Sequence, residues 1–128
     1  MINLVGPINS GVAAGTAGSA TNNSTTAQPV IGRVLAVYVR YNDSPPAGTT
    51  DATISTAGTN APANAFLTIS NAATSGWFYP RVTPHGITGA ALTALTVLEP
   101  CPICDKVTVT ITGADAADSL DVWLVVEN

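Results

Sequence analysis

Two cysteines, Cys101 and Cys104, are the residues whose type and spacing most directly suggest chemistry. A Cys-x-x-Cys pair acts as a redox centre when a helix N-terminus lowers the pKa of its first thiol. Here the pair precedes DKVTVTIT, an alternating pattern typical of a strand, and no βαβ pattern surrounds it. We therefore expect two small apolar residues, buried or in a bend that leads into a strand near Lys106, either as free thiols or as a local disulfide.

Other residues that could hold a metal or catalyse a reaction are few. A structural zinc site usually needs two Cys or His pairs, whereas this chain has one cysteine pair and one histidine, His85. His85 is not accompanied by a nucleophile motif, so we interpret it as a loop histidine with a structural hydrogen bond. Asp115, Asp118 and Asp121 lack the spacing of a calcium loop and are typical of a turn. We predict no catalytic, metal or cofactor-binding residue, and no enzyme activity.

The composition points to a chain that works by binding. Charged residues make up 9% of the 128 residues, against roughly 25% in an ordinary soluble domain. A low charge suits a subunit that buries much of its surface against partners. Four scattered basic residues do not form the basic stripe that nucleic-acid binding requires. No apolar run approaches the ~20 residues of a membrane-spanning helix, so neither nucleic acid nor membrane is an expected partner.

The N-terminal part of the chain differs from the rest. The stretch Asn9–Pro29 consists almost entirely of Gly, Ala, Ser, Thr and Asn, and such a segment buries too little apolar surface to fold alone. We predict a low-complexity arm over residues 1–29 that is either a flexible tail or becomes ordered on a neighbouring subunit. Its apolar start favours the second alternative and supplies four candidate contact residues: Ile2, Leu4, Val5 and Ile8.

Residues 30–128 contain several short β-type segments separated by turn residues, and no convincing amphipathic helix. The pattern predicts an all-β domain, an antiparallel β-sandwich of jelly-roll or Greek-key type. Strict alternation over 107–112 and 120–127, joined by GADAADS, predicts an antiparallel hairpin. The segment 91–99 is ambiguous between helix and strand, and its Thr and Val residues favour strand.

The densest aromatic cluster lies in GWFYPRV, which we predict to be a strand interrupted by Pro80. Trp77, Tyr79 and Arg81 are the contact candidates in this segment. Exposed aromatic side chains bind sugar faces or form protein hot spots, although a core position is equally consistent with Trp77. For Arg81 we expect a carboxylate partner, within the fold or across a subunit boundary.

Three segments of this chain resemble small structural proteins of tailed bacteriophages. These segments are GRVLAVYVRYNDSPPAGTTDATIST, GWFYPRVTPHGITGA and PICDKVTVTITGADAADSLDVWLVVE. The shared elements are a hydrophobic strand, a TD-T-I-T stretch, a YPR…H…G stretch and a C-terminal D-V-VTI…DS-DVWL pattern. The resemblance covers residues 31–127, and neither the N-terminal stretch nor the two cysteines belong to the shared pattern.

The resemblance implies a virion component, a capsid decoration (cement) protein made in the host cytoplasm and carried on the capsid exterior. The partners it implies are the major capsid protein and further copies of the chain, for which we expect a trimer because threefold axes are common in shells. An alternative hypothesis is a head- or tail-fibre module that binds host glycans through Trp77, Tyr79 and Arg81.

Overall fold

The computed structural model describes residues 1–42, 46–71, 74–92 and 98–128, and every regular element within these ranges is a β-strand. The larger sheet has the order β1 (Ile2–Asn9), β10 (Leu120–Glu127), β3 (Val30–Tyr41), β8 (Glu99–Asp105) and β7 (Arg81–Val82), with β6 (Gly76–Phe78) also paired to β3. The smaller sheet has the order β2 (Ala20–Thr25), β9 (Val107–Ala114), β4 (Asp51–Thr56) and β5 (Ala65–Ile69). Among the described residues no helix is long and apolar enough to cross a membrane.

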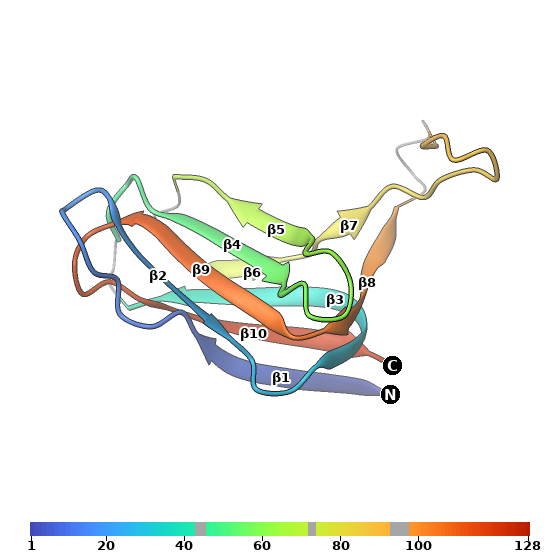
Figure 1. Cartoon of the computed structure of the whole chain (residues 1–128), viewed down its shortest axis with the longest axis horizontal. Coiled ribbons are helices and arrows are strands. Elements are labelled where there is room, and N and C mark those ends of the chain that lie inside the picture. Colours follow the sequence, from blue (N-terminus) through green and yellow to red (C-terminus); the bar gives the residue numbers. More distant parts are fainter. Residues whose placement is uncertain (43–45, 72–73, 93–97) are drawn as a thin grey trace.

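The two sheets are antiparallel and stack face to face, which confirms the predicted β-sandwich (Figure 1). The chain passes from one sheet to the other between β1 and β2, between β2 and β3, and between β3 and β4. The first strand, β1, pairs with the last, β10, so that both ends of the chain lie side by side. This strand order is that of a jelly roll.

The core lies between the sheets and is built from the alternating residues that the sequence predicts. In β9, Val107, Val109 and Ile111 are fully buried, and in β10 so are Leu120 and Leu124. The intervening Thr and Asp side chains face away from the core. Period-2 alternation is the signature of a strand with one buried face, and here both strands obey it.

The predicted hairpin between residues 107–112 and 120–127 is wrong, although both strands exist. β9 pairs with β2 and β4 in the smaller sheet, whereas β10 pairs with β1 and β3 in the larger sheet. The turn between them connects the smaller sheet to the larger sheet, so the two strands do not pair with each other. Alternation identifies the buried face of each strand but does not identify the strand beside it.

The N-terminal segment is part of the sandwich and does not form a separate arm over residues 1–29. β1 closes one edge of the larger sheet beside β10, and β2 closes one edge of the smaller sheet beside β9. Its small side chains fit the tight space at the end of the sandwich, where Ala13 and Ala20 are buried. The backbone N–H and C=O groups of this segment form hydrogen bonds with strands from the far end of the chain. The composition of the segment does not reveal this pairing.

The Cys-x-x-Cys segment is itself a strand, β8, and not the bend that we predicted. β8 lies beside β3, and its only other neighbour in the described structure is the two-residue β7. Pro100 and Pro102 are tolerated here because most of β8 lacks a second strand neighbour that would need their missing N–H groups. At Lys106 the chain leaves the larger sheet, and β9 starts the next residue in the smaller sheet.

The buried carboxylate of Asp105 fixes this crossing. Its Oδ2 atom accepts backbone N–H groups from Gly58 at 3.1 Å, Thr59 at 2.9 Å and Asn60 at 3.4 Å. Its Oδ1 atom accepts the N–H of Lys106 at 2.8 Å. Burial alone raises the pKa of Asp105, but these four donors outweigh burial and hold its pKa below the ordinary value. The carboxylate thereby ties the loop after β4 to the corner between the two sheets.

Two further sequence predictions concern the segment between β5 and β8. The break at Pro80 is confirmed, because β6 ends at Phe78 and β7 begins at Arg81. Of the strand predicted over 91–99, residues 93–97 lie outside the described part of the chain. Ala91 and Leu92 are not in a strand, and only Glu99 belongs to β8.

Candidate interaction surfaces

The two cysteines lie on opposite faces of β8. Cys101 points into the core and is buried, whereas Cys104 is exposed, and both thiols are free. Three residues of extended strand separate their Cα atoms by roughly 10 Å, beyond the ~7 Å limit of a disulfide. Burial raises the pKa of the Cys101 thiol, which makes it a poorer nucleophile. The geometry favours the structural interpretation of the pair.

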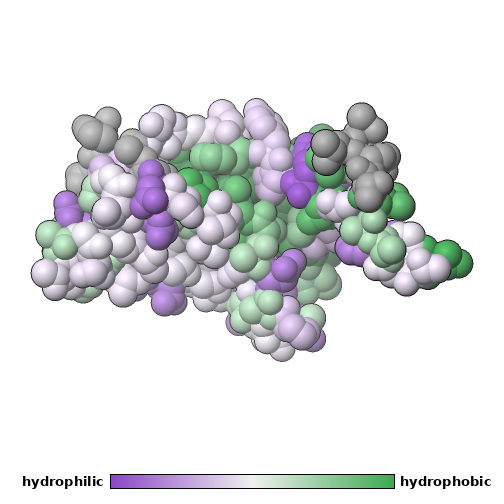
Figure 2. Space-filling view, turned by 90° about the horizontal axis from the view of Figure 1, so that it is seen from above, coloured by the Kyte–Doolittle hydropathy of each residue, from purple (hydrophilic) through white to green (hydrophobic). Residues whose placement is uncertain are grey.

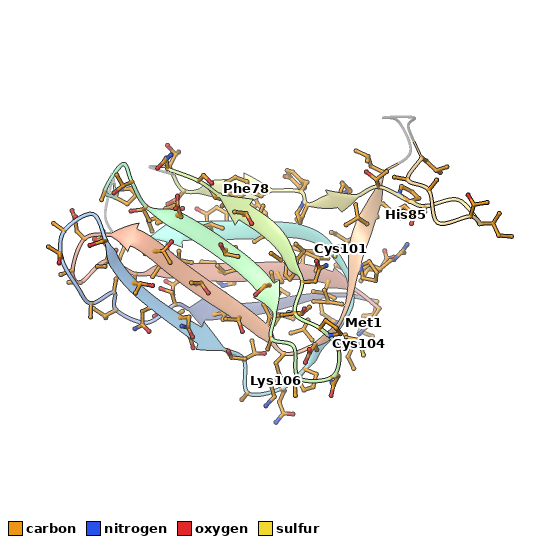
Figure 3. All side chains as sticks on the ribbon, turned by 45° about the horizontal axis from the view of Figure 1, so that its top comes forward. Met1, Phe78, His85, Cys101, Cys104 and Lys106 are labelled. Carbon is orange, nitrogen blue, oxygen red and sulfur yellow. The ribbon has the colours of Figure 1, made fainter. Side chains whose placement is uncertain are left out.

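The remaining candidates for chemistry are dispersed in the structure. His85 lies on a segment that projects from the body, while Cys101 and Cys104 lie along β8 (Figure 3). Within residues 1–42, 46–71, 74–92 and 98–128, no three His, Cys, Asp or Glu side chains come together to hold a metal ion. Asp115 accepts the N–H of Gly18 at 2.9 Å, and Asp118 accepts the N–H of Asp115 at 3.1 Å, so both serve the turn before β10.

The outer surface of the larger sheet gathers apolar side chains from four strands. Leu4 of β1 lies opposite Val125 of β10, and beside them Trp123, Tyr38 and Trp77 form a row across β10, β3 and β6. The ring centroids are 5.1 Å apart for Tyr38 and Trp77 and 5.8 Å apart for Tyr38 and Trp123. Aromatic pairs at such distances stabilise each other. We call these five residues the aromatic face.

Two charged rows flank the aromatic face. On one side, Arg33 of β3 forms an ion pair with Glu127 of β10. On the other side, Arg40 donates to Asp121 at 2.9 Å and its guanidinium carbon lies 4.9 Å from the ring centroid of Trp123. Burial raises the pKa of Asp121, but hydrogen bonds from Asn9 and Arg40 and the charge of Arg40 hold it below the ordinary value.

Several predicted contact residues meet on this face. Ile2 and Leu4 are 62% and 65% exposed, and Trp77 is 52% exposed, which is unusual for side chains of this size. The structure therefore brings three candidates together from two distant parts of the chain. Ile8 is buried in the core and Val5 packs against the core, so the prediction that these two are contact residues is wrong. Val5 alternates with the exposed Ile2 and Leu4, and a register shift between Val5 and Ile8 turns Ile8 toward the core as well.

Arg81 binds backbone carbonyl oxygens and does not form the predicted ion pair within the described structure. β3 pairs with β8 up to Val34 and with β6 from Val37 onward, which leaves a gap beside Leu35 and Ala36. The Arg81 guanidinium donates to the carbonyl oxygen of Leu35 at 3.0 Å and to that of Pro80 at 2.8 Å. It replaces a strand partner at the point where the chain leaves the sheet. No carboxylate partner of Arg81 is found in the described structure.

The register shows how the chain leaves the sheet. Phe78 lies opposite Val37 and Cys101 lies opposite Val34, so β6 and β8 run in the same direction along the same side of β3. The intervening chain departs after Phe78, pairs with itself as β7 and β8 at its base, and returns at Cys101. Figure 1 shows this excursion extending far beyond the body of the sandwich.

A small hairpin over residues 84–92 forms the described outer part of the excursion, and we call it the projecting hairpin. Leu92 donates to the carbonyl oxygen of Pro84 at 2.9 Å, and Gly86 donates to that of Ala90 at 2.8 Å. Gly89, at φ +85°, closes the turn by donating to Gly86. Ile87 stands at the tip with its side chain fully exposed. The outer end of the excursion is white to green in Figure 2, as expected for neutral and apolar residues.

Sequence reasoning missed the projecting hairpin, although a signal was present. From Val82 to Leu98 the sequence has no Asp, Glu, Lys or Arg. We predicted a strand over its last part, residues 91–99, from the Thr and Val residues there. The Pro-His-Gly and Thr-Gly turn residues within it are the signal for a hairpin, and its position outside the body depends on pairing that only the fold specifies.

Replacing Arg81 with alanine is expected to loosen the base of the excursion and leave the sandwich intact. The carbonyl oxygens of Leu35 and Pro80 lose a charged donor, which is worth about 1.5 kcal/mol and corresponds to roughly tenfold faster amide exchange in the projecting hairpin. Hydrogen exchange followed by mass spectrometry measures this, with Arg33→Ala as a matched control because its guanidinium pairs only at the surface. Equal exchange in the two variants would contradict the assigned role of Arg81.

Comparisons of this chain with protein-family models, with curated proteins and with solved structures found no match.

Proposed function

We propose that this chain is a capsid decoration protein that binds the outer surface of an assembled bacteriophage shell and bridges neighbouring shell subunits. The projecting hairpin carries this proposal. It exposes Ile87 completely and has no charged residue beside it, so water is an unfavourable environment for it. A neutral hairpin that extends from a rigid base suits insertion into an apolar groove of a partner.

Other features of the molecule support binding rather than catalysis. The charged fraction is 9%, and the exposed apolar residues gather on the aromatic face as well as on the projecting hairpin. The resemblance to small phage structural proteins over residues 31–127 adds the expected class of partner. Decoration stabilises a shell by mass action, because a protein that binds only the assembled state shifts the equilibrium toward that state.

Binding of the purified protein to empty expanded shells tests the proposal. We expect Ile87→Asp to weaken binding about 30-fold or more, since a charge replaces an anchor side chain in a desolvated site. Val12→Asp is the matched control, because Val12 is also exposed (60%) but lies in the loop after β1, at the opposite end of the sandwich. Equal binding by the two variants would contradict a role for the hairpin, and no binding by the wild-type protein would contradict decoration.

Host-glycan recognition is the second candidate function. Trp77 is half exposed and its ring contacts that of Tyr38. The exposed ring of Trp77 provides an aromatic surface of the kind on which sugars stack. Arg81 contributes less to this candidate than the sequence suggested, because its guanidinium is engaged with backbone carbonyl oxygens. Loss of host adsorption in Trp77→Ala, with shell binding retained, is the result that favours glycan recognition over decoration.

A further inference from the structure

The charges beside the aromatic face are arranged by strand. Both outward acids, Asp121 and Glu127, lie on β10, whereas both outward bases, Arg33 and Arg40, lie on the adjacent β3. Each base is directly opposite an acid in the register, so acid and base form two parallel columns about one strand spacing apart. The arginine side chains are 57% exposed, which leaves them able to contact a second molecule.

This column pattern distinguishes between the two ways in which two copies can pair face to face around a twofold axis. If the axis runs across the strands, β10 lies on β10, and Asp121 of one copy faces Glu127 of the other. Like charges then meet at every corner, which opposes association. If the axis runs along the strands, β10 of one copy lies on β3 of the other. Asp121 then faces Arg40 and Glu127 faces Arg33 at both ends of the interface.

We propose that two copies of this chain form a dimer through the aromatic face, with the twofold axis parallel to β3 and β10. Each surface ion pair then becomes part of a network of four alternating charges, which is more stabilising than isolated pairs. Between the two networks, Trp123 of each copy packs on Tyr38 of the other, and Trp77 lies opposite β1 of the second copy. Leu4 and Ile2 at the β1 edge pack toward β8 and β6 of the second copy. The interface is self-complementary in charge and apolar at its centre, as stable homodimer interfaces are.

The dimer has a consequence for shell binding, and this consequence rests on the proposed function. A twofold axis along the strands leaves the direction of the strands unchanged. Both projecting hairpins therefore leave the dimer from the same end, next to the chain termini seen in Figure 1. Two hairpins that point the same way bind two neighbouring shell subunits at once, and the second contact raises affinity through effective concentration. This dimer takes the place of the trimer expected from shell symmetry.

A charge exchange tests the dimer. We expect the wild-type protein to sediment at about 26 kDa at micromolar concentration, twice the 12.9 kDa of one chain. Arg40→Asp alone places that aspartate opposite Asp121 both within the chain and across the interface, and we expect at least tenfold weaker dimerisation. The double variant Arg40→Asp/Asp121→Arg restores both contacts, and we expect it to be dimeric again. Circular dichroism and thermal unfolding establish that each variant is folded.

Mixing the wild-type protein with the double variant gives the sharpest result. In a mixed dimer, Asp121 of the wild-type chain faces the aspartate at position 40 of the variant, and the two arginines face each other. We therefore expect native mass spectrometry to find both homodimers and at least tenfold less mixed dimer than the statistical ratio. A statistical share of mixed dimer, or a monomeric or trimeric wild-type protein, would overturn the proposal.

Two single variants separate this proposal from the proposed function. We expect Trp77→Asp to be a folded monomer, because the charge would be buried against β1 of the second copy. We expect Ile87→Asp to remain a dimer and to lose shell binding, because the projecting hairpin lies outside the interface. A dimer that does not bind shells leaves the dimer proposal intact and contradicts decoration. Wild-type monomers that bind shells contradict the dimer and leave decoration intact.

Discussion

Replacing Gly113 with alanine is expected to lower the free energy of unfolding by about 3 kcal/mol, with a fall in Tm of roughly 10 °C. Gly113 lies near the end of β9 at φ +61°, a left-handed conformation that costs other residues energy. A Cβ atom built there would lie 2.3 Å from the carbonyl oxygen of Thr49, which no side chain tolerates. Thr49 cannot retreat easily, because its hydroxyl donates to the carbonyl oxygen of Gly113 at 2.6 Å.

Gly48 provides the matched control for this substitution. It lies in the same loop as Thr49, has no left-handed φ, and a Cβ atom built on it meets nothing within 4 Å. We expect Gly48→Ala to change the free energy of unfolding by less than about 0.5 kcal/mol. Denaturant titrations of the two variants measure the difference. Similar stability of Gly113→Ala and Gly48→Ala would contradict the close contact between Gly113 and the backbone of Thr49.

The second large effect is expected at Asp105, where Asp105→Asn should destabilise the fold more than Asp51→Asn. One amide nitrogen of the asparagine would replace an oxygen that accepts backbone N–H groups, so two donors would face each other at the corner between β8 and β9. Asp51 is a suitable control, because its carboxylate also accepts a backbone N–H, that of Asn71, but lies on the smaller sheet, outside the proposed dimer interface. Urea unfolding at neutral pH compares the two variants, and the reverse order of stability would contradict the role assigned to Asp105.

The lowered pKa of Asp105 leads us to expect a loss of stability in acid. The pKa of Asp105 in the fold lies below its ordinary value of 3.8, which applies to the unfolded chain. A carboxylate of this kind stabilises the fold fully above that value and loses its contribution as the pH falls through the lower folded pKa. We expect the wild-type protein to lose stability in this acid range and Asp105→Asn to lose less. Parallel stability curves for the two proteins between pH 5 and pH 2 would contradict the account.

Residue alternation predicted the buried faces of the strands correctly, but strand partners were not predictable from it. The alternation over 107–112 and 120–127 separates Val107, Val109 and Leu124 from the Thr and Asp residues between them, which requires only the pleat of a strand. The pairing of β9 with β2 joins residues that lie far apart in the sequence, such as Ser24 and Val109. A turn such as GADAADS fits a hairpin and a crossing between sheets equally well, so local chemistry does not decide between them.

The prediction of a separate N-terminal arm was wrong for a related reason. Its composition of small polar residues is typical of a segment that does not fold alone. In the intact fold, β10 and β9 supply edges that satisfy its backbone, and Ala20 fills a space that a larger side chain would not enter. Sequence reasoning named Ile2, Leu4, Val5 and Ile8 together, and only the pairing of β1 with β10 distinguishes the exposed Ile2 and Leu4 from the other two.

The location and copy number of this protein on purified virus particles test the central claim most directly. The proposed function implies that a tailed phage encodes the chain, and a density map of the particles of that phage, combined with quantitative mass spectrometry, gives both values. The account predicts the β-sandwich at regular, symmetry-related positions on the outside of the shell, with the projecting hairpin in contact with the shell subunits. Its presence only in the tail or only in the host cytosol, or its absence from the particles, would contradict the account.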